Sequence, residues 1–584
     1  MNDAVPLSTL DRRVCDRARA TRDPRFDGLF FIAVTSTRIY CRPVCPAPAP
    51  KNRNIRYYAS AAAASAAGFR PCLRCRPEAA PGSPLHRAKS DLVAGALRLI
   101  EQGALDETSL PELARRVGVG ERHLRRLFAE ELGASPLEVA ATRRLLFAKK
   151  LLTETALPIT AIAPAAGYAS LRRFNAAFLE TYGRAPREIR RQLDPASATD
   201  ELELRLPYRP PYDFAHLIGF MERRVIPGVE SVEANAYRRT FTAAGMPGWL
   251  SVAQIPGQSA LALRVHHVKP SALGDIVARV RRMFDVDADP IAINAHLRPD
   301  ALLKPLVKRW PGQRLPNAWD GFELAVRAIL GQQVSVAAAR TLAARIADNH
   351  GVRFDEGESV GLHALFPTPE TLAEAPLEKI GVMRARADAI RTLARAVAEG
   401  RVHFRTEQTL AAFEASLVAL PGIGPWTAHY VAMRALGQPD AFPAADLILR
   451  RAAGQGEMLS TRAVEAMSQA WRPWRAYAVM LLWRSHMCTD DAPRSRPPKS
   501  RTTSSIRRSD RSSSPPRTKP SCHCCCRRTA SRRMSRRNGI ARRRGFAKHV
   551  RSSLRISPAS CSHSISTSRR AALSSSAASG MSSA

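Results

Sequence analysis

The 584-residue sequence has no run of 18 apolar residues and no cysteine between Cys75 and Cys488. The first absence argues against a membrane-spanning helix, and the second is a poor match to the disulfide framework of a long secreted protein. The first twenty residues lack a basic start followed by an apolar stretch, so we expect no signal peptide. Acidic residues are also scarce: 51 Asp+Glu stand against 89 Lys+Arg, a formal charge of +38. Without a membrane segment, such an excess favours a polyanion, above all nucleic acid, as the partner.

The positive charge is concentrated in the last 100 residues, which hold 23 Lys+Arg, 3 Asp+Glu and 26 serines. They account for +20 and leave +18 on the preceding 484 residues. Because periodic apolar residues are almost absent there, residues 486–584 are predicted to be a disordered Arg/Ser-rich tail. Two other interpretations remain: an arm that binds RNA or DNA, or a reading frame that shifts after about Arg484.

The remainder of the chain divides by texture into four segments. Residues 1–82 are short apolar runs broken by Pro, Gly and cysteine pairs, and residues 85–193 show amphipathic helical periodicity. Residues 204–311 mix strand-like and helical runs, and residues 314–485 return to helical patterns. The sequence therefore predicts a multidomain α+β protein: a small metal-binding domain, an all-α domain, an α+β domain, a second all-α domain and the tail.

Two short-spaced cysteine pairs lie in the first segment, Cys41 with Cys45 and Cys72 with Cys75, separated by 26 residues. Each pair can place two thiolates on one metal, and four thiolates in tetrahedral geometry suit Zn²⁺. On spacing alone, a purely structural zinc ribbon is the favoured interpretation.

The residues around these cysteines, FDGLFFIAVTSTRIYCRPVC and YYASAAAASAAGFRPCLRCRP, resemble the N-terminal domain of Ada-type adaptive-response proteins over about 55 residues. The resemblance implies one Zn²⁺ held by all four cysteines. It also implies that Cys41 accepts a methyl group from a DNA methylphosphotriester, while Cys45, Cys72 and Cys75 act as ligands only. Methylation would remove one negative charge from the cluster and so strengthen DNA binding.

Two similar helix-turn-helix patterns follow within the second segment. Ser109-Leu-Pro-Glu112 has capping-box spacing before LARRVGV, and ERHLRRLFAEELG follows Gly120. The second pattern is LPITAIAPAAGY followed by SLRRFNAAFLETYGRAP. The alternative is an all-helical domain that does not bind DNA and whose arginines are simply exposed to solvent. Pro164 counts against the second unit, because a proline inside a helix can cost ~3 kcal/mol.

The tandem patterns resemble the AraC-type activator domain over some 100 residues, most specifically at FNAAFLETYGRAP. The resemblance implies that the basic and polar side chains early in each second helix face successive major grooves of DNA. These are Arg122, His123, Arg125 and Arg126 in the first unit, and Arg172, Arg173 and Asn175 in the second.

The stretch from Leu420 to Ala428, LPGIGPWTA, is typical of a hairpin between two helices. Gly422 and Gly424 allow a tight turn whose backbone amides can bind one DNA phosphate without sequence preference. Asp446 lies downstream; taken alone, it is better interpreted as a helix cap than as a catalytic residue.

The motifs AVRAILGQQVSVAAA, FPTPETLAEA, the hairpin and WRPWRAYAVMLLW occur in the order seen in AlkA-type 3-methyladenine DNA glycosylases. With residues 204–311 the similarity covers some 280 residues, and it implies that Asp446 is the catalytic aspartate acting on a flipped-out nucleotide. It further implies a base pocket lined by Trp426, Tyr430 and Trp483, any of which could instead be a core aromatic.

Three differences from related proteins refine the expectation. Trp426-Thr427 stands where bifunctional relatives carry a Schiff-base lysine, so we expect a monofunctional enzyme that leaves an abasic site. Gln333 stands where related enzymes insert a leucine into the duplex, which leaves the wedge role in doubt. Pro520-Ser-Cys-His-Cys-Cys-Cys526 only faintly echoes the Pro-Cys-His-Arg site of a second methyltransferase, so that activity is expected to be absent.

Together these resemblances imply a DNA-damage response protein that senses methylated DNA, activates transcription and excises N-alkylated purines. Its expected partners are double-stranded and alkylated DNA and, for activation, RNA polymerase, with no membrane partner. The expected location is the bacterial cytoplasm, at the nucleoid. The alternative is a transcription regulator whose glycosylase-like half binds DNA but has lost catalysis.

Overall fold

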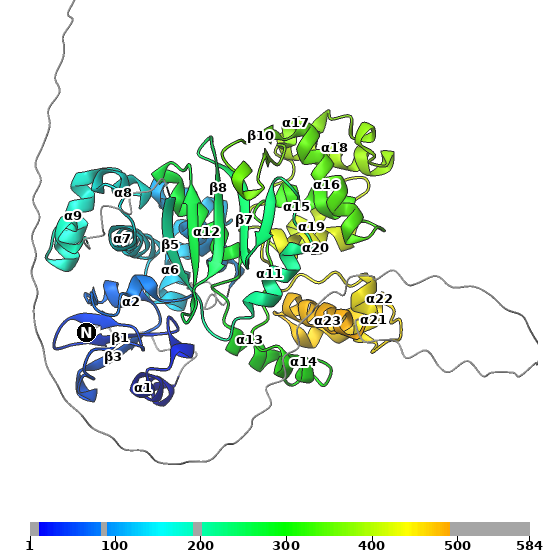
Figure 1. Cartoon of the computed structure of the whole chain (residues 1–584). Coiled ribbons are helices and arrows are strands. Elements are labelled where there is room, and N and C mark those ends of the chain that lie inside the picture. Colours follow the sequence, from blue (N-terminus) through cyan, green and yellow to red (C-terminus); the bar gives the residue numbers. More distant parts are fainter. Residues whose placement is uncertain (1–10, 83–89, 191–200, 491–584) are drawn as a thin grey trace, which may run out of the picture. The chain divides into compact units, whose positions relative to one another are not determined.

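The computed structural model describes residues 11–82, 90–190 and 201–490 of the chain (Figure 1). The tail from residue 491 onward, including the cysteines from Cys522 to Cys526, lies outside the described residues. Among the helices described, none has both the length and the apolar character needed to cross a bilayer.

The N-terminal segment folds around a small four-stranded sheet. Its elements are α1 (Arg12–Thr21), β1 (Phe31–Val34), β2 (Ile39–Cys41), β3 (Ile55–Tyr58), α2 (Ala61–Ala66) and β4 (Arg70–Pro71). The strand order is β3-β1-β2-β4, and β4 runs parallel to β2 with Tyr40 opposite Pro71. Cys41 and Cys72 are the residues that follow this pair, so the strand register itself brings the two cysteine pairs together.

The next segment is entirely helical. It contains α3 (Asp91–Glu101), α4 (Ala104–Glu107), α5 (Leu110–Arg116), α6 (Glu121–Leu132), α7 (Pro136–Glu154), α8 (Ile159–Ala165), α9 (Leu171–Tyr182) and α10 (Pro186–Ile189). The pairs α5–α6 and α8–α9 are the two predicted helix-turn-helix units. The second helix of each buries a stripe of equal spacing: Leu124, Phe128 and Leu132 in α6, and Phe174, Phe178 and Tyr182 in α9.

Pro164 does not prevent α8 from forming. It is the last residue but one of the helix and is exposed to solvent. The amide hydrogen that it lacks would have bonded the carbonyl of Thr160, and Thr160 is itself exposed, so water can satisfy that group. The doubt that the sequence raised about the second helix-turn-helix therefore has no basis in its backbone.

Residues 201–309 form a five-stranded antiparallel sheet with helices. The elements are β5 (Glu201–Pro207), α11 (Phe214–Glu222), β6 (Glu230–Glu233), β7 (Ala236–Ala243), β8 (Met246–Gln254), β9 (Ala260–His266), α12 (Leu273–Met283), α13 (Pro290–Leu297) and α14 (Leu303–Arg309). The strand order is β5-β9-β8-β7-β6. One face of the sheet packs on α12 (Figure 1): Leu204 and Val265 share a core with Ile276 of that helix. The predicted mixture of strands and helices is confirmed.

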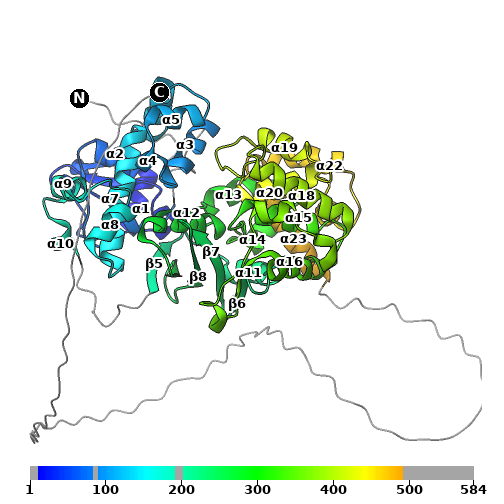
Figure 2. The ribbon, with the colours of Figure 1, turned by 90° about the horizontal axis from the view of Figure 1, so that it is seen from above.

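The C-terminal part of the described chain is a helical bundle. It contains α15 (Gly321–Leu330), α16 (Val336–His350), β10 (Val352–Arg353), β11 (Ala364–Leu365), α17 (Pro369–Ala373), α18 (Arg384–Ala398), α19 (Leu410–Val418), α20 (Pro425–Ala435), α21 (Leu447–Ala453), α22 (Thr461–Ser468) and α23 (Arg475–Asp490). Helix α15 is buried along almost its whole length and contacts α20 (Figure 2). Helices α19 and α20 flank the predicted hairpin, and Asp446 immediately precedes α21. The multidomain α+β class is confirmed.

Candidate metal centre, DNA-binding surfaces and base pocket

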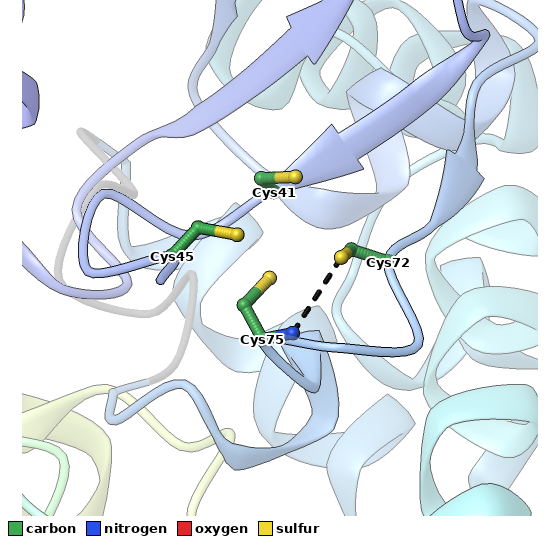
Figure 3. Close-up of side chains that lie close together, drawn as sticks. All are labelled: Cys41, Cys45, Cys72 and Cys75. Atoms are coloured by element: carbon green, nitrogen blue, oxygen red, sulfur yellow. Dashed lines mark hydrogen bonds between the residues drawn. The ribbon is translucent and has the colours of Figure 1, made fainter. Parts of the chain in front are cut away.

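The four cysteines of the N-terminal segment meet in one cluster (Figure 3). All four Sγ atoms lie within 4.8 Å of one another. Zinc–sulfur bonds of about 2.3 Å in a tetrahedral site place sulfur atoms about 3.8 Å apart, so the cluster fits one Zn²⁺. Four soft sulfur donors without oxygen or nitrogen ligands also select this metal over Mg²⁺ or Ca²⁺.

The four sulfurs differ in hydrogen bonding. Cys75 Sγ accepts the backbone N–H of Arg42 at 3.4 Å, and Cys72 Sγ accepts that of Cys75 at 3.5 Å. The backbone of Ala47 donates to Cys45, whose pKa falls to about 7, chiefly through its hydrogen bond with Cys41. Within the described residues, no backbone N–H donates to Cys41 Sγ. Because such bonds stabilise a thiolate and reduce its reactivity, Cys41 is the least restrained nucleophile of the four.

Exposure divides the cysteines into two pairs. Cys72 and Cys75 are 7% and 5% exposed, whereas Cys41 and Cys45 are partly open to solvent. Arg42, which the sequence did not single out, supports this arrangement: its Nη1 donates to the carbonyl of Cys75 at 3.1 Å and its Nε to Asp27 at 2.8 Å. Its place between the first two cysteines was the only signal of that role.

The predicted DNA-reading side chains of both helix-turn-helix units are exposed. They lie outside the buried stripes of α6 and α9: Arg122, His123, Arg125, Arg126, Arg172, Arg173 and Asn175. In α6, Arg125 pairs with Glu121 at 2.6 Å. Both faces are free to meet DNA, and which bases or phosphates they touch stays a prediction.

The hairpin between α19 and α20 depends on its two glycines for different reasons. Gly422 has φ +83°, and a Cβ there would lie 2.8 Å from Cβ of Ala389. Gly424 is the N-cap of α20, and a Cβ there would meet nothing within 4 Å, so its surroundings are open. The amides of the first helical turn have no carbonyl partner within the helix and can bind an anion approaching from that side.

Gln332 secures the hairpin from the end of α15. Its Nε2 donates to the carbonyl of Gly422 at 3.1 Å and to Thr427 Oγ1 at 3.2 Å. The neighbouring Gln333 is exposed and has φ +56°, in the left-handed region. Its side chain is therefore available on the surface beside the hairpin, and its wedge role stays a prediction.

Asp446 is a helix cap, and its carboxylate also accepts hydrogen bonds from two aromatic side chains. As N-cap of α21, its Oδ1 accepts the backbone N–H of Leu449 at 2.8 Å. The carboxylate also accepts both indole groups: Trp426 Nε1 on Oδ2 and Trp483 Nε1 on Oδ1, each at 3.0 Å. Three N–H donors thus fix one carboxylate group.

The three predicted pocket aromatics form a continuous wall next to Asp446. The Trp426 and Tyr430 rings stack with centroids 5.5 Å apart and an interplanar angle of 11°, and Trp483 lies 6.3 Å from Tyr430. Trp483 is 9% exposed, whereas Trp426 and Tyr430 are partly open to solvent. Packing in the hydrophobic core explains the burial of Trp483, but it does not explain why the Trp426 and Tyr430 rings are partly exposed.

Arg434 lies behind this wall. Its Nη1 donates to the Tyr430 hydroxyl at 2.6 Å and its Nε to the carbonyl of Pro316 at 2.8 Å. Burial would raise the pKa of Tyr430, but the charges of Arg434 and Arg224 outweigh it and the pKa is lowered. No sequence motif includes Arg434, although its position four residues after Tyr430 on one helix was a usable signal.

Four family models match the chain, in the order that the motifs suggested. They are the metal binding domain of Ada (residues 14–78), a helix-turn-helix domain (113–192), the AlkA N-terminal domain (203–320) and the HhH-GPD superfamily of base excision DNA repair proteins (326–476). A probable bifunctional transcriptional activator/DNA repair enzyme AlkA of Mycobacterium tuberculosis is 40% identical over 475 residues, which cover 80% of this chain and 95% of that protein.

The chain belongs to the bifunctional Ada/AlkA family of activators and DNA repair enzymes. Two further relatives match parts of it. DNA-3-methyladenine glycosylase 2 of Escherichia coli is 34% identical over 48% of this chain and 95% of that protein. The Ada activator/repair enzyme of the same organism is 44% identical over 20% of this chain and 31% of its own length. The matches to the metal binding domain of Ada and to the HhH-GPD superfamily span the cysteine cluster and Asp446, respectively.

Proposed function

We propose that this Ada/AlkA-family protein excises N-alkylated purines from DNA and senses methylphosphotriesters through Cys41, activating transcription in response. The observation that carries the first activity is the Asp446 carboxylate, fixed by two indole N–H groups at an aromatic wall beside a DNA-binding hairpin. The observation that carries the second activity is Cys41, the partly exposed sulfur of the cluster to which no backbone N–H donates among the described residues.

Base excision follows from charge and geometry. The hairpin amides hold the backbone near a nucleotide that is flipped against Trp426 and Tyr430. As the bond between sugar C1′ and the base breaks, its electron pair goes to the base and positive charge develops on the sugar. Asp446, held as an oriented carboxylate, stabilises that charge. A water oxygen then bonds C1′, and Thr427 in place of a lysine leaves an abasic site with no Schiff base.

An abasic-site assay on duplex DNA with 3-methyladenine tests this activity. Asp446→Asn retains the cap acceptor for Leu449 and removes the charge, so excision should fall by roughly a thousandfold while DNA affinity stays unchanged. Asp355→Asn, an exposed change far from the hairpin in sequence, is the matched control. Wild-type protein that binds the duplex but releases no base would support the alternative, a regulator with an inactive glycosylase half.

Methyl transfer to Cys41 is a direct displacement. Zinc bound to the four sulfurs would keep them deprotonated at neutral pH. Cys41 Sγ attacks the methyl carbon, the carbon–oxygen bond to the phosphotriester breaks, and the phosphate regains its negative charge. The product thioether carries no charge, so one repulsion between the cluster and the DNA backbone disappears.

Mass spectrometry after incubation with DNA carrying methylphosphotriesters tests the sensor. A single methyl group should map to Cys41, with the buried Cys15 of the same domain as internal control. Binding to methylphosphotriester-free duplex should tighten after methylation of the wild type, and Cys41→Ala should show no such change on the same treatment. Methylation of Cys45 in place of Cys41 would refute the assigned nucleophile.

The activator role needs both helix-turn-helix units on DNA and a contact with RNA polymerase, in the bacterial cytoplasm at the nucleoid. The support is the pair of exposed basic faces on α6 and α9. A reporter gene under the protein's own promoter should be induced by methylating agent with wild-type protein and stay silent with Cys41→Ala.

A further inference from the structure

The loop between α20 and α21 brings Asp446 to the pocket, and a side chain of α20 holds this loop partway along. Phe442 in the loop is 1% exposed, and its backbone N–H donates to Nδ1 of His429 at 3.1 Å. A buried amide without an acceptor is destabilising, so this bond fixes the path of the loop. The backbone N–H of Asp446 donates to the carbonyl of Pro443, the residue after Phe442, at 2.9 Å. The place of Phe442 therefore sets the place of the Asp446 backbone.

His429 can hold this amide only as a neutral ring. A backbone N–H always donates, so Nδ1 of His429 carries no proton and Nε2 carries the single one. Nε2 lies 3.3 Å from Oε2 of Glu414 in α19, which is the acceptor for that proton. Burial lowers the pKa of His429 and outweighs the opposing charge of Glu414, so the ring is neutral at neutral pH. Glu414 therefore holds the tautomer that the Phe442 amide needs.

Helix α20 consequently holds Asp446 by two routes. Trp426, in the first turn of the helix, donates its indole N–H to the carboxylate at 3.0 Å. His429, three residues later, holds the backbone of the loop through Phe442. The amides at the start of the same helix belong to the proposed phosphate site of the hairpin. One rigid element would therefore position both the DNA phosphate and the carboxylate, as an oriented charge beside a bound nucleotide requires.

We infer that His429 positions the carboxylate of Asp446 for base excision by holding the Phe442 amide. The inference rests on the proposed glycosylase activity and adds a positioning residue to it. His429 takes no part in the chemistry, because each of its ring nitrogens has a partner within the fold, Phe442 on one and Glu414 on the other. Its contribution is the place of the carboxylate relative to C1′, since a shift of about 1 Å in a catalytic group can cost about a hundredfold in rate.

Single-turnover excision of 3-methyladenine by the full-length protein tests the inference. His429→Leu removes the acceptor, so the loop shifts and the maximal rate should fall by about 10- to 100-fold. The protein concentration that gives half the maximal rate should stay unchanged, because the DNA-binding surfaces are untouched. His429→Asn should recover most of the lost rate, because its Oδ1 can accept the Phe442 amide from the position of Nδ1. His296→Leu, the same change at an exposed histidine of α13, is the matched control.

The Asp446→Asn protein provides a background that separates positioning from general damage to the fold. If His429 acts through the charge of Asp446, His429→Leu should slow the Asp446→Asn protein by less than about two-fold. Misfolded protein would instead raise the half-saturating concentration and leave the maximal rate unchanged. An unchanged rate in His429→Leu, no recovery in His429→Asn, or the full loss in the Asp446→Asn background would overturn this inference alone. Wild-type protein that binds the duplex but releases no base would overturn the proposed glycosylase function, and this inference with it.

Discussion

Trp483 Nε1 donates to Asp446 Oδ1 at 3.0 Å and so ties α23 to the N-cap residue of α21. Trp426 Nε1 occupies the other oxygen at the same distance from α20. Each carboxylate oxygen therefore has its own indole donor, and the orientation of the group is set before substrate arrives. Two residues of the proposed base pocket thus also hold the proposed catalytic carboxylate in place.

Trp483→Phe tests this positioning. The change keeps an aromatic ring against Tyr430 but removes one N–H from Asp446, so single-turnover excision of 3-methyladenine should slow by roughly 10- to 100-fold. Trp426→Phe should slow it to a similar degree, because it removes the equivalent bond on Oδ2. DNA affinity measured by fluorescence anisotropy should not change. Full activity in both variants would show that the carboxylate is held by other contacts.

The two hairpin glycines should respond differently to alanine. Gly422→Ala forces a side chain into φ +83° and against Ala389, so it should destabilise the protein by about 1–2 kcal/mol and weaken DNA binding. Gly424→Ala adds a methyl in open space at φ −98°, so the melting temperature should stay unchanged. Differential scanning fluorimetry and DNA titrations give both quantities. Equal melting temperatures for the two variants would contradict the account of Gly422.

Most of the domain organisation and of the candidate sites could be predicted from the order of the cysteine pairs, the helix-turn-helix patterns and the hairpin along the chain. The metal-binding role of the four cysteines from Cys41 to Cys75 can be predicted from their spacing, because two closely spaced cysteine pairs are enough to ligate one metal ion. The fold class follows from texture, since helical and strand periodicities change along the chain. Asp446 is different: its context read alone favours a cap, and the structure shows that the cap is real and that two indoles reach it as well.

Side-chain contacts between segments that carry no motif could not be predicted. Asp27, which precedes β1, meets Arg42, which follows β2, and Arg434 of α20 meets the carbonyl of Pro316. Neither pairing has a spacing rule. Pro164 shows that local sequence rules can also mislead. A proline in the interior of a helix destabilises it, but Pro164 lies near the C-terminal end of α8 and is exposed to solvent, and only the fold reveals both facts.

The exposed faces of α6 and α9 give a prediction for DNA binding. Arg172→Ala and Arg122→Ala should each weaken promoter binding, and loss of a phosphate contact should reduce the salt slope by about 1. Arg115→Ala is the control, because Arg115 is exposed on α5 and pairs with Glu112. Affinity should be measured at several salt concentrations with the methylated protein. A slope unchanged in both variants, with unchanged affinity, would exclude these residues from the interface.

The buried Asp285 predicts how the free energy of unfolding changes with pH. Burial raises its pKa from 3.8 to about 6, although Oδ2 accepts the N–H of Leu315 and the hydroxyl of Tyr477. The folded state therefore holds a proton that the unfolded chain has released between about pH 4 and pH 6, and the free energy of unfolding falls as pH rises through this window. A difference of this size corresponds to up to about 3 kcal/mol.

Asp285→Asn should remove that dependence. Its amide oxygen can still accept from Leu315 and Tyr477, and asparagine tolerates the φ of +49° found there. Denaturant unfolding at pH 4 and pH 6.5 should show the wild type losing stability relative to the variant as pH rises. The exposed Asp355→Asn should follow the wild type. Parallel stability curves for the wild type and Asp285→Asn would mean that Asp285 is charged in the folded protein throughout this range.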